Sequence, residues 1–356
     1  MRRIKLVFSD FHLGKGRLDE YGRINPLEDF HDDRKLIEFL QYYGEKRFFP
    51  DEIELVVNGD FFELLVVDEH DLLRDRETEQ TALRKLHRIF EGHKEVFDAL
   101  VEFNSRPRNS ITFLPGNHDS GLLWPKVQEA LIERLGPSTR IVAGAHNIGP
   151  VHIAHGNHHE FAHSYNVRNF SYRDARGEHI FRLPMGDLFV KQFLSIIKRD
   201  RPYIDKVKPF TMYLKYAFVN DHFFWSLLFG LARFWLSNRF SRDPVRRREF
   251  RLSLNRVRNA LTHESMDKAA YNILKSTSYR YVIFGHSHKQ VHKRFGAYGE
   301  YINTGTWNEV ISLQLPHLGQ RVERTYVHID ATDEDEPVVR VKRWIGSHQL
   351  EEDIAL

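Results

Sequence analysis

Polar side chains of the types that bind metal ions follow five short apolar runs in this sequence. The candidates are Asp10 and His12 after IKLVFS, Asp60 after IELVVN, Asn117, His118 and Asp119 after ITFLP, His155 after VHIA, and His286 and His288 after YVIF. Asp10 and His12 are two residues apart, as are His286 and His288, and this spacing points both side chains of a pair to the same side of an extended chain. Each pair can therefore bind one ion.

The donor set favours transition metals over calcium or magnesium. Carboxylate, imidazole and amide oxygen together suit Mn²⁺, Fe or Zn²⁺, whereas Ca²⁺ and Mg²⁺ sites take oxygen ligands almost alone. The candidate ligands are too many for one ion and suit two ions that share a bridging carboxylate: Asp10, His12, Asp60, Asn117, His155, His286 and His288. We expect two divalent ions, with Mn²⁺ favoured and Fe or Zn²⁺ as alternatives.

Charge arithmetic indicates which substrate such a centre would take. Two divalent ions carry four positive charges and the carboxylates of Asp10 and Asp60 remove two, so the centre stays positive and attracts an anion. Two ions about 3.5 to 4 Å apart can activate water at neutral pH and stabilise the attacking and leaving oxygens of a displacement at phosphorus. Hydrolysis of a phosphate-containing anion by a hydroxide that bridges the ions is the predicted reaction.

The runs before these residues have the length of β-strands, and helical patterns separate the first three. Leu36, Leu40 and Tyr43 share one helical face, and residues 83–101 repeat apolar side chains at three- and four-residue spacing. Alternating strands and helices predict an α/β sheet covered by helices, and such sheets bind ligands beyond the carboxyl ends of their strands. After His288 the pattern changes to short alternating strands.

Composition excludes several functional classes. The chain has 356 residues, 41% hydrophobic and 28% charged, which suits one large globular domain or one domain with an insertion. It has no cysteine, so a disulfide framework, a zinc finger and a thiolate nucleophile are excluded. The net charge of +3 does not by itself predict a nucleic-acid partner. The start MRRIKLVFSD is typical of a first strand and not of a signal peptide, so we expect a cytoplasmic protein.

Five motifs together resemble the calcineurin-like metallophosphoesterase superfamily: SDFHLG, NGDFFEL, LPGNHD, AHGN and FGHSHK. The resemblance covers residues 1–160 and 278–345 and implies a four-layer α/β/β/α sandwich with a dinuclear metal site. It implies one metal on Asp10, His12 and His288, the other on Asn117, His155 and His286, and Asp60 as the bridge. It further implies that His118 protonates the leaving oxygen or stabilises the transition state, and that Asp119 orients the His118 imidazole.

The residues after Asp60 narrow the substrate class. Residues 61–64, FFEL, do not continue the D-R-G signature of the protein phosphatases of this fold, and are similar to the G-D-L-F-E of the UDP-2,3-diacylglucosamine hydrolases. This sequence departs from those hydrolases at His118, where they usually have Arg, and in a longer insertion. A lipid-linked nucleotide such as UDP-2,3-diacylglucosamine is the expected substrate. The alternatives are a nuclease or general phosphodiesterase and, from another class, a non-catalytic scaffold.

Residues 161–277 form a predicted helical cap insertion, and residues 346–356 a C-terminal tail. The centre of the insertion, YAFVNDHFFWSLLFGLARFWLSNRF, is rich in aromatic residues, but charge and glycine interrupt it before it reaches a membrane-spanning length. It is either a buried cap helix or an apolar surface for acyl chains or a membrane interface. Arginines follow it and suit anionic lipid headgroups, although they would also attract nucleic acid. Candidate substrate contacts are His158, His159, Arg233 and Arg247.

Overall fold

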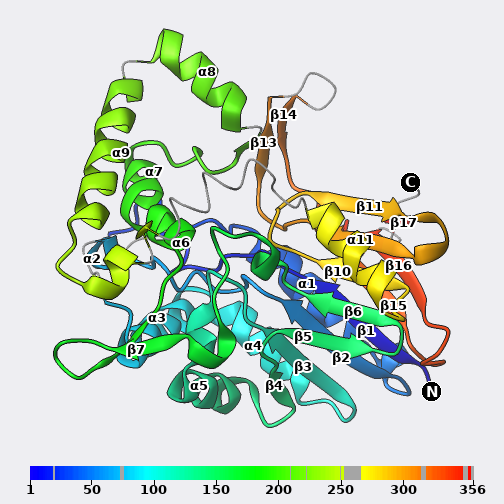
Figure 1. Cartoon of the computed structure of the whole chain (residues 1–356). Helices are drawn as coiled ribbons and strands as arrows, with labels where there is room; N and C mark the ends of the chain where they lie inside the picture. The colour runs from blue at the N-terminus through cyan, green and yellow to red at the C-terminus, as the bar shows by residue number, and fades with distance from the viewer. Residues whose placement is uncertain are drawn as a thin grey trace.

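The computed structural model describes residues 1–18, 21–72, 76–208, 210–221, 223–248, 250–251, 266–313, 318–347 and 352–353. Two β-sheets lie at its centre, and helices cover their outer faces (Figure 1). Residues 252–265, which include the last part of the arginine-rich stretch, lie outside the described residues.

The first sheet has seven strands in the order β17-β16-β15-β1-β2-β3-β4. Its parallel part comprises β1 (Arg3–Phe8), β2 (Glu52–Asn58), β3 (Asn109–Leu114) and β4 (Thr139–Ile141). Its antiparallel part comprises β15 (Thr325–Asp330), β16 (Val338–Arg343) and β17 (Glu352–Asp353), which lies in the predicted tail. Because β1, β2 and β3 are parallel, the motifs that follow them meet at one edge of the sheet.

The second sheet has five strands in the order β11-β12-β10-β6-β5. They are β5 (Ala145–Ile148), β6 (Val151–Ala154), β10 (Tyr281–Phe284), β11 (Gln290–Arg294) and β12 (Glu300–Thr304). The strands β6, β10 and β12 are mutually parallel, so His155 and the motif at residues 285–288 also leave one common edge. Val7 and Val56 of the first sheet share a buried cluster with Ile153 and Ile283 of the second, which places the two sheets face to face.

Helices form the two outer layers, because their apolar residues repeat on one face and bury it against a sheet. The helices α1 (Asp33–Tyr43), α3 (Glu79–Gly92), α4 (Lys94–Asn104) and α5 (Pro125–Leu135) join the core cluster of the first sheet, while α2 (Glu69–Leu72) is a single short turn. Leu36, Leu40 and Tyr43 are buried as their spacing predicts. The helix α11 (Met266–Ser276) packs on the second sheet. The layers confirm the predicted α/β/β/α sandwich.

The insertion supplies most of what lies beyond the sandwich. It contains the hairpin β7 (Ser171–Arg173) and β8 (His179–Phe181), then α6 (Met185–Phe189), a π-helical turn (Val190–Leu194), α7 (Ser195–Asp200), β9 (Val207–Lys208), α8 (Phe210–Asn220) and α9 (Phe223–Arg239). The strand β9 pairs with β13 (Val310–Ser312), which also pairs with β14 (Gly319–Arg321). The helices α8 and α9 project from the top of the molecule (Figure 1).

Two features of the insertion concern its expected C-terminal boundary and the expectation that it contains no membrane-spanning helix. The helix α11 falls inside the range 161–277 but packs on β10 and β12, so it belongs to the outer layer of the sandwich, a correction to the expected boundary. None of the helices formed by the described residues combines the length and the apolar character needed to cross a bilayer.

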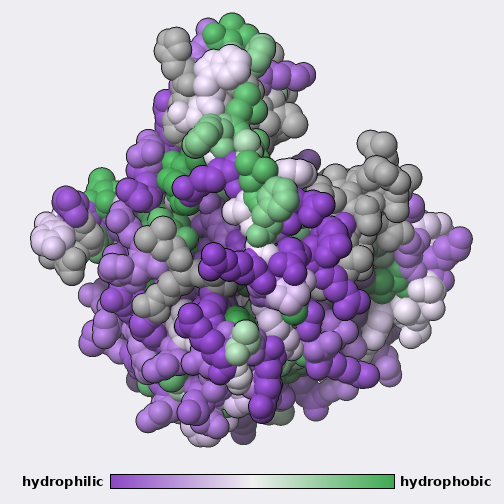
Figure 2. Space-filling model, turned by 60° about the vertical axis from the view of Figure 1, so that its left-hand side comes forward, coloured by the Kyte–Doolittle hydropathy of each residue, from purple (hydrophilic) through white to green (hydrophobic). Residues whose placement is uncertain are grey.

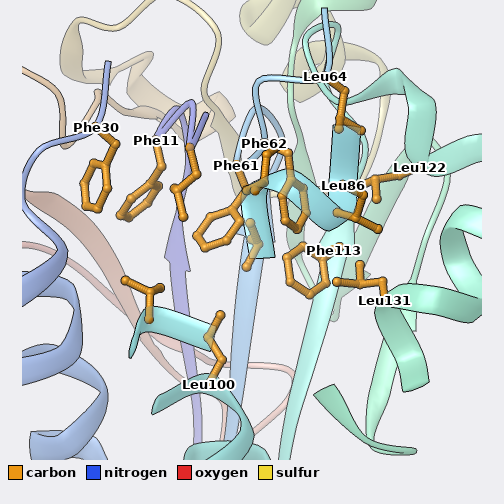
Figure 3. Close-up of a cluster of buried hydrophobic side chains, with 14 of the residues drawn as sticks. Phe11, Phe30, Phe61, Phe62, Leu64, Leu86, Leu100, Phe113, Leu122 and Leu131 are labelled. Atoms are coloured by element: carbon orange, nitrogen blue, oxygen red, sulfur yellow. The ribbon is translucent and has the colours of Figure 1, made fainter. Parts of the chain in front are cut away.

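Aromatic side chains anchor the loops that leave β1 and β2 (Figure 3). Phe11 follows Asp10, Phe61 follows Asp60, and both rings are fully buried with their centroids 5.3 Å apart. Burial of each ring stabilises the fold by about 1.5–3 kcal/mol. Since each ring points into the core, the carboxylate before it is directed toward the opposite side of the loop.

A buried charge cluster supports the loop that follows His12. The Glu28 carboxylate accepts hydrogen bonds from the backbone N–H of Gly14 (3.0 Å) and Gly16 (2.7 Å). The His93 ring lies 3.4 Å from Glu28 and, on its Nδ1 side, 2.9 Å from Asp33 at the start of α1. Burial lowers the pKa of His93, but these two carboxylates outweigh that effect and raise the pKa to about 9.

We expect His93 to make stability depend on pH. Because its folded pKa lies above the unfolded value, the stabilisation is complete below about pH 6.5 and is lost as the pH rises through about 9. Between those limits the free energy of unfolding of the wild type should fall by roughly 3 kcal/mol relative to that of His93→Gln. Urea unfolding at a series of pH values measures this difference, and parallel pH profiles for the two proteins would contradict it.

Candidate metal centre

Five of the expected ligands have an unusual backbone conformation. Among the described residues, seven non-glycine residues have a positive φ angle, and five of those are expected ligands: Asp10, His12, Asp60, His286 and His288. A left-handed backbone costs a residue with a Cβ about 1–2 kcal/mol. Such a conformation persists only where the surrounding structure enforces it, and it is concentrated at functional sites.

The first expected group converges. Asp10, His12 and His288 offer ligand atoms that all lie within 4.8 Å of one another. The Nε2 atoms of His12 and His288 are 3.0 Å apart, and His288 Nε2 is 3.4 Å from Asp10 Oδ1. Two imidazole nitrogens and a carboxylate oxygen directed at one point suit a divalent transition metal.

The two histidines of the second expected group converge on Asp60. Asp60, His155 and His286 form another such cluster, and Asp60 belongs to a third with His12 and His118, so Asp60 lies between the two expected groups. His155 Nδ1 donates to the Asn58 carbonyl at 2.8 Å, which directs Nε2 toward Asp60 Oδ2 at 3.0 Å. A backbone carbonyl that orients a histidine in this way is typical of metal ligands.

Asn117 is the third member of the second expected group. Its Nδ2 donates to Asp187 Oδ1 at 3.0 Å, while its Oδ1 is buried and has no hydrogen-bond partner among the described residues. A buried carbonyl oxygen without a partner costs free energy, and a cation would remove that cost. The amide therefore fits its expected role as an oxygen ligand.

The carboxylates of the two groups differ in their electrostatic surroundings. Burial raises the pKa of Asp60, but His155 and His118 outweigh this effect and hold the pKa well below its usual range. Burial is the largest effect on Asp10 and raises its pKa, although His155 opposes the shift. Ionised Asp10 needs positive charge beside it, and a divalent ion would supply that charge.

His118 is oriented by a residue that the sequence did not single out. His118 Nδ1 lies 2.5 Å from Glu63 Oε2, whereas Asp119 accepts from the backbone N–H of Gly116 (2.5 Å) and Phe61 (2.9 Å). The expected role of Asp119 is thereby corrected: it holds the loop backbone, and Glu63 holds the imidazole. Burial lowers the pKa of His118, but Glu63 and Asp60 raise it to about 10.

The centre opens on a cavity of about 830 Å³. Its polar end contains the expected ligands His12, Asp60, Asn117, His286 and His288 together with His118 and Glu63. The insertion supplies its apolar walls: Phe161, Met185, Phe189, Val190, Phe193, Leu194, Ile204 and Phe234. We call this cavity the chamber; its volume is typical of small-molecule sites, which span roughly 300–1,000 Å³.

A model of the calcineurin-like phosphoesterase family matches residues 5–290. The chain belongs to this family. The family is one of phosphoesterases that use divalent metals, and the three clusters of candidate ligands agree with that use. The comparison of this chain with curated proteins found no match.

One solved structure similar to this chain is a Staphylococcus aureus protein assigned as a 5′-nucleotidase, in complex with alpha-ketoglutarate. The two chains are 12% identical with a TM-score of 0.32, and the match covers 92% of this chain and 50% of the other. The chain thus spans half the length of that protein. At such a TM-score the likeness carries no conclusion about substrate.

The expected substrate contacts lie away from the chamber wall. His158 packs edge-on against Tyr165, and His159 stacks on Phe284. Arg233 is exposed on α9, and Arg247 donates to the Ser241 carbonyl at 2.6 Å. Among the described residues, the lysines that line the chamber are Lys198, Lys206 and Lys208. Substrate binding by the four expected residues therefore stays a prediction that no contact supports.

Sequence reasoning missed two polar residues of the centre, Glu63 and Asp187. It named His163 as either a phosphate contact or a residue at the cap entrance. Glu63 follows Asp60 by three residues, and its place within the second motif was a usable signal. Asp187 is 70 residues from Asn117 in the sequence, and no local pattern connects them. His163 lines the chamber and lies 2.6 Å from Asp187 Oδ1.

We expect Glu63→Gln to reduce kcat about 10- to 100-fold, because His118 loses the carboxylate that orients it and keeps it protonated. Since Glu63 raises the pKa of His118, its removal should move the alkaline limb of the kcat profile to lower pH.

Steady-state hydrolysis of an aryl phosphoester across pH measures both effects. Glu300→Gln is a matched control, because Glu300 pairs with His292 at 2.6 Å near the start of β12, the end remote from the centre. Unchanged alkaline limbs in both variants would contradict the role of Glu63.

Proposed function

We propose that this phosphoesterase uses two divalent ions, with Mn²⁺ the best fit to its donors, to cleave a phosphoester or pyrophosphate bond in an amphiphilic substrate. A lipid-linked nucleotide such as UDP-2,3-diacylglucosamine is the specific candidate. The observation that carries the proposal is the chamber, because one continuous cavity joins the expected ligands to apolar side chains of the insertion.

In this proposal Asp10, His12 and His288 would hold one ion, Asn117, His155 and His286 would hold the other, and Asp60 would be shared by both. The ions, when bound, activate water and neutralise developing charge at phosphorus. Because Glu63 occupies Nδ1 of His118, the other ring nitrogen, Nε2, is left to donate a proton to the leaving oxygen.

The apolar walls favour a substrate with a hydrocarbon portion over a nucleic acid. Phe189, Phe193 and Phe234 offer no donors for a phosphate backbone, and each gains stability by contact with an apolar chain. Of the lysines in the chamber, Lys198 is paired with Asp29 and with Asp205 (2.9 Å). Lys208 lies on β9 and lines the chamber. Burial, His12 and Lys208 together lower the pKa of His288, and Lys208 is a candidate contact for substrate phosphate.

We expect the Mn²⁺-reconstituted enzyme to turn over UDP-2,3-diacylglucosamine much faster than an aryl phosphodiester, an aryl phosphomonoester, or single- or double-stranded DNA. The acyl chains gain burial in the chamber that the other substrates lack. Hydrolysis of this matched panel by the purified protein is the measurement.

Asp60→Asn is the variant that tests the metal chemistry on the same panel. It should lower turnover of every substrate by roughly a thousandfold or more, because it removes the charge shared by both ions. Equal turnover of all substrates would contradict the lipid assignment, and full activity of Asp60→Asn would contradict the two-ion mechanism.

The proposal includes contact between α9 and a lipid surface. Large apolar side chains on its outer side are exposed, among them Trp225 (64%), Phe229 (74%) and Leu236 (49%). Hydrophobic residues gather on the projecting part of the molecule (Figure 2). On the opposite side of α9, Phe234 packs on Phe189 and lines the chamber, so one helix joins the exposed surface to the substrate cavity.

Charge favours an anionic bilayer over a second copy of the chain. The sequence of α9, FFWSLLFGLARFWLSNR, contains arginine but no acidic residue, and Arg233 and Arg239 are exposed. Two copies joined through this surface would bring arginines together, which is unfavourable, whereas anionic headgroups attract them. Aromatic side chains are also enriched at bilayer interfaces. A cytoplasmic, membrane-peripheral location is the corresponding prediction.

We expect Phe229→Ser combined with Leu236→Ser to weaken binding to vesicles that contain anionic lipid by at least about tenfold, because each side chain loses a favourable burial. Vesicle sedimentation measures the binding. Phe49→Ser is the control, since Phe49 is 55% exposed on the sandwich and outside the insertion. Unchanged vesicle binding, or self-association in place of binding, would contradict the lipid surface.

A further inference from the structure

Asn117 is held by a residue of the insertion. A carboxylate only accepts hydrogen bonds, so the contact of 3.0 Å between Asn117 Nδ2 and Asp187 Oδ1 requires the amide nitrogen to face α6. The amide oxygen must then face away from Asp187, and Asn117 lines the same cavity as the expected ligands Asp60 and His286. This oxygen is buried and has no hydrogen-bond partner among the described residues.

Burial and a second hydrogen bond hold the Asp187 side chain in position. It is fully buried near the start of α6, and its Oδ1 also accepts from His163 Nδ1 at 2.6 Å. The neighbouring Gly186 permits this close approach, because a Cβ there would lie 2.6 Å from His163 Cε1 and 2.7 Å from the Ala162 carbonyl oxygen. The short helix is thus packed directly against the segment that follows His155.

We propose that Asp187 is a positioning residue through which the insertion sets the amide of Asn117 for its metal ion. The inference rests on the two-ion centre proposed above and adds a connection between that centre and the cap. Asp187 contacts no other expected ligand in the described hydrogen bonds, so its effect is confined to the ion that Asn117 binds.

This arrangement couples the cap to metal binding. The residues that follow α6, Val190, Phe193 and Leu194, line the chamber, so the segment that orients Asn117 also shapes the apolar wall. By thermodynamic linkage, a substrate that stabilises this position of the segment also strengthens binding of the ion at Asn117, and the ion strengthens substrate binding in return.

The experiment is calorimetric titration of the metal-free protein with Mn²⁺. We expect the wild type to bind two equivalents, and Asp187→Ala to bind one ion normally and the other about 10- to 100-fold more weakly, as for other residues that orient metal ligands. Asp187→Asn keeps an oxygen that can accept from Asn117 and should restore most of this affinity. If the alanine variant fails to fold, Asp187→Ser removes the same acceptor with a smaller change in polarity.

A double-mutant comparison separates this role from general stability. In an Asn117→Ala background, Asp187→Ala should cause no further loss of Mn²⁺ affinity, because the residue acts through the amide. Glu77→Gln is the matched control: Glu77 is buried, accepts from Lys85 at 2.8 Å, pairs with Lys191 of the insertion and touches no expected ligand. Its Mn²⁺ affinities should equal those of the wild type.

The outcomes distinguish this inference from the proposed function. A wild type that binds fewer than two ions would overturn both. A wild type with two ions and an unchanged Asp187→Ala variant would overturn only the role of Asp187. An equal loss in Glu77→Gln, or an additional loss in the Asn117→Ala background, would also overturn it, because either result would show that loosening of the insertion and not the amide contact weakens the ion.

Discussion

The left-handed backbone of the expected ligands is the constraint on which the rest of this structure depends. Asp10, His12 and Asp60 each have a positive φ, at a cost of about 1–2 kcal/mol per residue. Hydrogen bonds between the two loops hold them there: the N–H groups of Phe11 and His12 both donate to the Asp60 carbonyl at 2.9 Å. Beneath the loops, the buried rings of Phe11 and Phe61 stabilise the same arrangement (Figure 3).

The packing of the two sheets brings the edges that carry the expected ligands together. Asp10, Asp60 and Asn117 follow strands of the first sheet, while His155, His286 and His288 follow strands of the second. Asn58 connects the two edges by hydrogen bonds: its side chain donates to the Ala154 carbonyl at 3.0 Å, and its own carbonyl accepts from His155. A centre assembled from both sheets forms only when the apolar cluster between them has formed.

The insertion adds a different property, an apolar environment beside a highly charged centre. Its π-helical turn places Phe193 and Leu194 on the chamber wall, and Lys191 of the same turn reaches the buried Glu77. Burying such charges is costly unless they are paired, so this ion pair favours one position of the insertion over others. Asp187 gives the insertion a separate contact at the metal centre, where it accepts a hydrogen bond from Asn117.

The sequence by itself determined the local parts of this protein. The apolar runs before Asp10, Asp60 and Asn117 predicted the strands and the edge at which they end, because strand length, helical periodicity and turn residues are local properties. The motifs predicted the groups that converge here within 4.8 Å. Only the tertiary structure decided that Glu63 and not Asp119 holds His118, and that Asp187 orients Asn117. Those contacts depend on how loops and an inserted helix pack, and packing joins residues whose sequence separation carries no periodic signal.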